Sequence, residues 1–140
     1  MKRILVGLDG SQRAAATLDA ATKLARACGA KLTLVRAVGL PPDIPQDLWK
    51  RSDEPIVDVL TSKAKSYLDE CAANVEPALL EATEVRVGVP WQALCEAAKR
   101  DGADLLVIGS HGYGGIDHVL GTTAAKIVNH ATCSVFVVRA

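Results

Sequence analysis

The chain has 140 residues, enough for one domain with a real core and too few for two. Its 16 basic residues balance its 16 acidic residues, which argues against nucleic acid or an anionic membrane surface as a partner. The apolar run in MKRILVGLDGS is too short for a signal peptide, and no later run approaches the length of a membrane span, so we expect a cytoplasmic protein.

Short apolar runs alternate with longer amphipathic patterns along the whole chain. In chain order the patterns predict a strand at 3–9, a helix at 11–29, a strand at 30–38, a helix at 56–75, a strand at 83–89, a helix at 90–102, a strand at 103–109, a helix at 116–131 and a strand at 134–140. Because strands and helices alternate, we expect one α/β domain over residues 1–140. Its sheet should be open, mostly parallel and five-stranded, with helices on both faces.

The first and the fourth predicted strands end in polar and glycine-rich sequence. The first strand runs into Asp9-Gly10-Ser11, and the fourth runs into Gly109-Ser110-His111-Gly112. In open α/β sheets, ligands bind beyond the carboxyl ends of the strands, where the strand order reverses. If the two strands are neighbours, one crevice holds both strand ends.

The stretch VIGSHGYGGIDHVLGTTAAKIVNHA, residues 107–131, places a glycine-rich loop between a strand and a helical pattern. This arrangement points free backbone N–H groups and the positive end of a helix at an anion. Gly121 falls inside the helical pattern, where it leaves space beside the hydroxyl groups of Thr122 and Thr123. We therefore predict that the segment binds phosphate. The alternative is that its glycines only form a tight turn and a close contact between helix and sheet.

The stretches ILVGLDGS, VIGSHGYGG and LGTTAAKIVNHATCSVFVVR resemble the universal stress protein family, and the resemblance covers the whole chain. It implies a Rossmann-like sheet of strand order 3-2-1-4-5 and ATP, with or without Mg²⁺, as the ligand. The nucleotide-binding residues that it implies are Gly7, Leu8, Asp9, Ala37, Ile108, Gly109, Ser110, His111, Gly112, Gly121, Thr122 and Thr123. The family motif G-x2-G-x9-G-[S/T] is one residue shorter here, because Tyr113 to Leu120 separate Gly112 from Gly121.

The resemblance also implies a homodimer that forms through the last strand, Val135 to Val138, whose apolar edge would otherwise need protection. The function that it implies is a stress response in which the bound adenine nucleotide alters contacts with partner proteins. No metal site is predicted, since His118 and His130 have no carboxylate or Cys at ligand spacing.

Two other functions remain open on the sequence. The chain could be an interaction module of the same fold that binds no nucleotide. It could also be a slow ATP hydrolase or autokinase, for which His111, Asp9 or Asp117 would have to supply the base. Asp9 has a further reading as the N-cap of the first helix, for which Ser11 is an equally good candidate.

Overall fold

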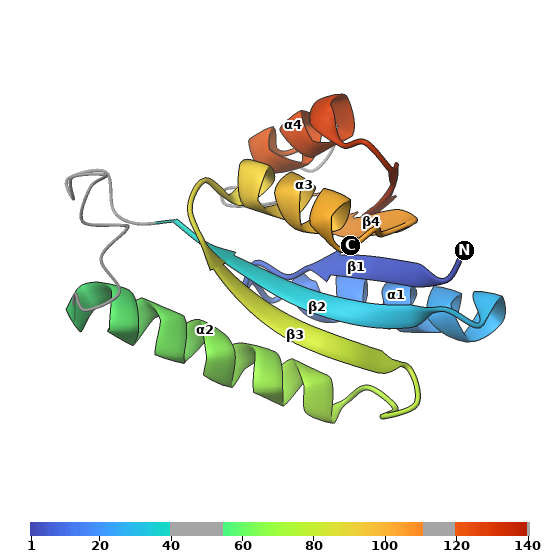
Figure 1. Ribbon diagram of the computed structural model, residues 1–140, viewed down its shortest axis with the longest axis horizontal. Coiled ribbons are helices and arrows are strands. Elements are labelled where there is room, and N and C mark those ends of the chain that lie inside the picture. Colours follow the sequence, from blue (N-terminus) through green and yellow to red (C-terminus); the bar gives the residue numbers. More distant parts are fainter. Residues whose placement is uncertain (40–54, 111–119, 140) are drawn as a thin grey trace.

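The computed structural model describes residues 1–39, 55–110 and 120–139, in which strands and helices alternate along the chain (Figure 1). The elements are β1 (Arg3–Gly7), α1 (Ala14–Cys28), β2 (Lys31–Val38), α2 (Pro55–Ala73), β3 (Leu80–Val87), α3 (Pro90–Arg100), β4 (Leu105–Gly109), α4 (Thr122–His130) and β5 (Ser134–Val138). The five strands form one sheet in the order β3-β2-β1-β4-β5, and all neighbouring strands are parallel. The predicted fold class and strand order are confirmed.

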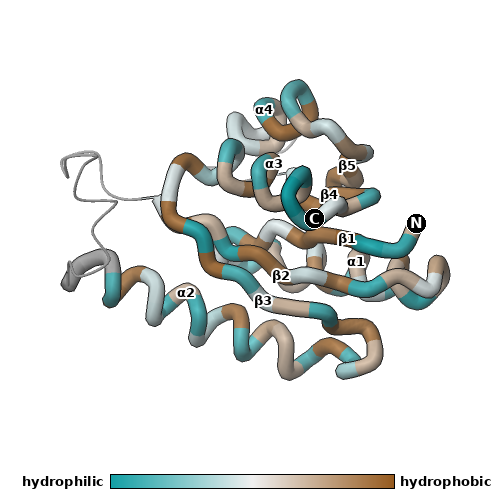
Figure 2. Tube along the Cα trace, in the orientation of Figure 1, coloured by the Kyte–Doolittle hydropathy of each residue, from teal (hydrophilic) through white to brown (hydrophobic). Residues whose placement is uncertain are grey.

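The helices cover both faces of the sheet, with α1 and α2 on one face and α3 and α4 on the other (Figure 1). Successive side chains of a strand point to opposite faces, so β1 contributes to both layers. Ile4 and Val6 belong to the cluster that includes Leu68 of α2, whereas Leu5 belongs to the cluster that includes Ile127 of α4. Burial on both faces explains why β1 is apolar from Ile4 to Val6 and β4 from Leu105 to Ile108. Figure 2 shows the change along β1, which is hydrophilic at its start and hydrophobic after it.

Several predicted boundaries differ from the structure by a few residues. The third strand begins at Leu80 and ends at Val87, earlier than the predicted 83–89. Helix α1 begins at Ala14 rather than at Ser11, and its N-cap residue is Arg13, whose side chain makes no capping hydrogen bond. The prediction that Asp9 or Ser11 caps this helix is therefore wrong. The two residues form a tight turn before the helix, in which Asp9 Oδ1 accepts a hydrogen bond from the N–H of Ser11 at 2.9 Å.

The carboxylate of Asp104 ties the start of β1 to the turn that precedes β4. Its Oδ2 accepts hydrogen bonds from the backbone N–H groups of Lys2, at 2.7 Å, and Arg3, at 2.9 Å. These two bonds favour the charged carboxylate, so they lower the pKa of Asp104 below its usual value. The N-terminal strand is thus anchored by an exposed ion rather than by a buried one.

We expect Asp104→Asn to lower the free energy of unfolding near neutral pH, and the difference from the wild type to shrink as the pH falls. Because the pKa is lowered in the folded state, the stabilisation is complete above the unfolded pKa of about 3.9 and is lost as the pH falls through the folded pKa. Urea unfolding of both proteins over a pH series measures this difference in the free energy of unfolding. Asp19→Asn on the exposed face of α1 is the matched control. A difference that stays constant below about pH 4 would contradict this role.

Candidate functional site

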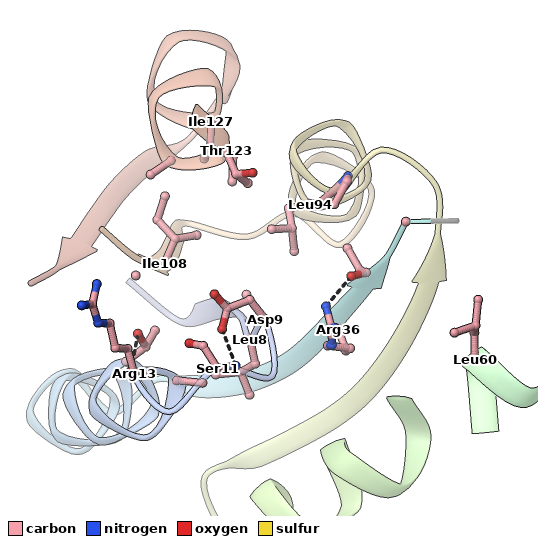
Figure 3. A pocket seen from close by; sticks show the side chains of 18 residues that line it. Leu8, Asp9, Ser11, Arg13, Arg36, Leu60, Leu94, Ile108, Thr123 and Ile127 are labelled. Atoms are coloured by element: carbon pink, nitrogen blue, oxygen red, sulfur yellow. Dashed lines mark hydrogen bonds between the residues drawn. The ribbon is translucent and has the colours of Figure 1, made fainter. Parts of the chain in front are cut away.

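The carboxyl ends of β1, β2 and β4 open into a cavity of about 400 Å³ (Figure 3). It lies where the strand order reverses, since the chain leaves β1 toward β2 on one side and β4 flanks β1 on the other. Side chains from both helical layers close it, with α1 below the strand ends and α3 and α4 above them in Figure 3. The predicted crevice between the first and the fourth strands is therefore present.

The end of β1 supplies three of the predicted site residues, Gly7, Leu8 and Asp9, to the cavity wall. A side chain at Gly7 would place its Cβ 3.0 Å from a methyl group of Leu94, so glycine lets α3 lie close to the strand. Asp9 is half-buried and lines the cavity while it also holds the turn to Ser11. The carboxylate is therefore positioned by the backbone that follows it.

The end of β2 supplies the predicted Ala37 together with Arg36, which is not one of the predicted site residues. The Nη1 of Arg36 donates a hydrogen bond to the carbonyl oxygen of Ala37 at 2.6 Å. Its guanidinium group lies across Gly10, and a Cβ atom added to Gly10 would be 3.5 Å from Nη2 of Arg36. Gly10 has a φ of 79°, so this turn requires glycine for its backbone as well.

The carboxyl end of β4 supplies Ile108 and Gly109, and the start of α4 supplies Thr123. Gly121 is the N-cap residue of α4 and donates its N–H to the carbonyl oxygen of Ser110 at 2.8 Å, which joins the helix start to the strand end. The first bond inside the helix runs from the N–H of Ala125 to Gly121. The N–H groups of Thr122, Thr123 and Ala124 therefore have no acceptor within the helix, and the last two of these residues line the cavity.

The helix predicted at 116–131 begins later than expected. Leu120 and Gly121 are not helical, and α4 covers Thr122 to His130. Gly121 consequently precedes the helix instead of interrupting it, and its conformational cost inside a helix does not arise. The glycine is a cap, so the following hydroxyl-bearing residues occupy the first turn, where anions bind.

The remaining predicted site residues that the structure describes do not line the cavity. Among the described residues, Gly121 and Thr122 lie outside its wall, and Ser110 is buried with 2% of its surface exposed. The hydroxyl of Ser110 has no hydrogen-bond partner in that part of the chain. His111 and Gly112 lie outside the described residues, as do Asp117 and His118.

Sequence reasoning missed two arginines and most of the apolar wall. Arg36 directly precedes Ala37 near the end of β2, so the strand-end rule that selected Asp9 also points to it. Arg13 directly precedes α1 and lies outside that rule. Neither forms an ion pair with a carboxylate among residues 1–39, 55–110 and 120–139. The residues that the helices contribute to the apolar wall are Ala14, Leu60, Pro90, Leu94, Ala124 and Ile127.

Tyr67 of α2 supports the turn after β1 from the layer below. Burial raises the pKa of its hydroxyl group, and the thiol of Cys71 and the carboxylate of Asp9 raise it further, while a hydrogen bond with the backbone of Gly10 lowers it. The tyrosine therefore remains uncharged at physiological pH. Its uncharged hydroxyl group hydrogen-bonds to the turn that contains Gly10 and Asp9, of which Asp9 lines the cavity.

Within the described part of the chain, no group of three or more His, Cys, Asp or Glu side chains is arranged to hold a metal ion. Across the same residues, no helix combines the length and the apolar character that crossing a membrane requires. The cavity thus offers an apolar wall, a single carboxylate, two guanidinium groups and a helix start. This set suits a ligand that joins a flat apolar group to an anion.

Comparisons with known proteins agree with this architecture. A family model described as the universal stress protein family matches residues 1–139. Universal stress protein A homolog 1 of Coxiella burnetii is 29% identical over 144 residues, covering 98% of this chain and 95% of that protein.

Two solved structures are similar over nearly the whole chain. Universal stress protein UspA from Lactobacillus plantarum has a TM-score of 0.78 at 25% identity, covering 99% of this chain and 97% of that one. A universal stress protein solved in complex with cAMP has a TM-score of 0.63 at 28% identity, covering 98% of this chain and 96% of that one.

Proposed function

The chain belongs to the universal stress protein family, and from this premise we propose that it binds an adenine nucleotide, ATP first of all, in the cavity at the carboxyl ends of β1, β2 and β4. The observation that supports the proposal is the meeting of an apolar cavity with the free first turn of α4. Adenine suits the apolar wall, and phosphate suits the helix start. The similar protein solved with cAMP holds a ligand of the same chemical class.

The contacts divide between the two sides of the cavity. We place adenine against Leu8 and the backbone of Ala37, whose carbonyl oxygen has a second lone pair besides the one that Arg36 uses. Asp9 then faces the ribose hydroxyl groups as a hydrogen-bond acceptor. Ile108 lies beneath the ribose in this arrangement.

The phosphates lie at Gly109 and Thr123, beside the first turn of α4 and within reach of Arg13. The predicted residues that follow Gly109 in sequence, together with the helix cap, would complete this end through their backbones. These are Ser110, His111, Gly112, Gly121 and Thr122. Mg²⁺, where present, would be held by the phosphates rather than by a protein cluster.

The test of this proposal uses the purified full-length chain. Protein that is denatured immediately after purification should release adenine nucleotide, and ATP titrated into nucleotide-free protein should give a saturable heat. ATP at a hundred times its dissociation constant should also add about 2.7 kcal/mol to the stability. Absence of both released nucleotide and binding heat would leave the alternative of an interaction module that binds no nucleotide.

We also propose that the chain forms a homodimer through β5 and that the bound nucleotide alters partner contacts in a cytoplasmic stress response. Strand β5 is an edge of the sheet and pairs only with β4 in the described part of the chain. An apolar edge without cover is available for pairing with a second copy. All four cysteines are free thiols, which is typical of a reducing compartment.

We expect Phe136→Lys to convert the dimer into a monomer. Phe136 is 44% exposed on the edge strand, and a charge there opposes pairing with a second edge. Light scattering coupled to gel filtration measures the mass. Val128→Lys, at a 47% exposed position on α4, is the control and should leave the mass unchanged. A wild-type protein that is already monomeric would overturn this part of the proposal.

A further inference from the structure

The cavity is lined by two arginines that stand on different sides of it. Arg13 precedes α1 and lies beside Ile108 in Figure 3, whereas Arg36 comes from β2 and lies on the other side of Asp9 in the same view. Neither guanidinium group has a carboxylate partner among the described residues. One carboxylate, Asp9, stands between two cations, so the cavity carries an excess of positive charge at both ends.

A nucleotide with phosphates only at its 5′ end would use one of these cations. In the proposed orientation the 5′-phosphates lie at β4 and α4, and β1 separates those elements from β2. Arg36 therefore falls on the adenosine side, beside the acceptor for the ribose hydroxyls. Adenine and ribose are uncharged, so such a ligand would leave this guanidinium group without an anion.

The geometry of Arg36 is suited to a second phosphate. Its Nη1 is held by the carbonyl oxygen of Ala37 at 2.6 Å, and its planar group packs over Gly10, which has no side chain to displace it. Nε and Nη2 have no hydrogen-bond partner in the described part of the chain. They form the side of the guanidinium fork that matches two oxygens of a phosphate.

We propose that the cavity selects an adenosine nucleotide that carries a phosphate on the 2′ or 3′ oxygen of the ribose in addition to its 5′-phosphate, and that Arg36 binds this second phosphate. The inference rests on the proposed function, because it uses the same cavity and the same orientation. In dinucleotide sites an acidic residue accepts a hydrogen bond from the ribose 2′-hydroxyl, or a nearby arginine accommodates a 2′-phosphate. Here Asp9 would accept from the one ribose hydroxyl that stays free, and Arg36 would bind the phosphate on the other.

Titration calorimetry with AMP, adenosine 2′,5′-bisphosphate and adenosine 3′,5′-bisphosphate tests the proposal on the full-length chain. One of the two bisphosphates should bind the wild type about tenfold to a hundredfold more tightly than AMP, as a charge-assisted pair allows. In Arg36→Gln the preference for a bisphosphate over AMP should vanish, because the ratio of the affinities reports the second phosphate alone. Arg13→Gln is the matched control, which removes a cation from the same cavity. It should weaken all three ligands and keep their ratio.

The other outcomes are distinct. If AMP and both bisphosphates bind the wild type equally, the second phosphate site is overturned and the proposed function stands. If Arg36→Gln weakens AMP and the bisphosphates by the same factor, Arg36 acts on the adenosine group itself, and the inference is wrong. If no ligand binds the wild type, the proposed function fails and this inference fails with it. Thermal unfolding of each variant, with Arg36→Lys as the charge-conserving substitution, shows that lost binding is not lost folding.

Discussion

The variant Thr123→Glu is expected to abolish nucleotide binding and to leave the protein at least as stable as the wild type. Thr123 lines the cavity in the first turn of α4, which contains no acidic residue. A carboxylate there would occupy the position proposed for phosphate and repel it, so the affinity for ATP should fall by roughly a hundredfold or more. The same charge interacts favourably with the helix start, by about 0.3–1 kcal/mol.

The opposite signs of these two effects make the substitution informative. Calorimetry gives the affinity for ATP, and urea unfolding gives the stability of the same preparation. Thr123→Gln has the length of the glutamate without its charge, so it should retain most of the affinity. If Thr123→Glu binds ATP within about threefold of the wild type, the phosphates do not lie at α4.

The second large effect is expected in the core, where Leu106→Ala should lower the free energy of unfolding by about 2–5 kcal/mol. Leu106 is fully buried in β4, opposite Leu5 of β1 and Val135 of β5, and it belongs to the cluster under α3 and α4. Typical domains have only about 5–15 kcal/mol of stability in total, so this single change removes a large share.

Urea unfolding measures this loss in the free energy of unfolding. The slope of that free energy against the urea concentration should be the same in the variant and the wild type. Val128→Ala is the control, because Val128 is 47% exposed on α4 and its truncation should change the stability by less than about 0.5 kcal/mol. A loss below about 1 kcal/mol for Leu106→Ala would show that β4 is not at the centre of the core.

The class of the fold and the number of strands could be predicted from the sequence because each central strand is buried on both faces. Leu5 packs in one layer and Ile4 in the other, so the pattern is a short apolar run rather than an alternation. The order of the strands came from the family resemblance. Periodicity says which residues are buried, and it does not say which strands are neighbours.

The start of α4 could not be located from periodicity. The helical spacing of apolar residues already includes Leu120. Leu120 is not helical, however, and the helix begins at Thr122. Leu120 is apolar because it packs against the cluster under α3 and α4, and that packing needs no helical backbone. Apolar residues recur wherever one side of the chain is buried. The pattern can therefore include a residue such as Leu120, which packs on the same core without being helical.

The two cavity arginines illustrate a different limit. Arg36 lies in β2, where the residues before and after it are buried. Its charge alone would suggest a solvated side chain near the strand end. Its place in the cavity wall depends on the turn at Gly10, which the guanidinium group crosses. That contact is between β2 and the loop after β1, and no local pattern in either segment encodes it.

The measurement that tests the account most directly is the titration of ¹⁵N-labelled protein with ATP, followed by the backbone amide signals. The signals of Asp9, Ala37 and Gly109, together with those of the first turn of α4, should shift and saturate at one common dissociation constant. Signals from Glu81 to Arg86 in β3, which lie outside the cavity wall, should stay in place. Shifts confined to β3, or no shift at millimolar ATP, would contradict the claim that the nucleotide binds where the strand order reverses.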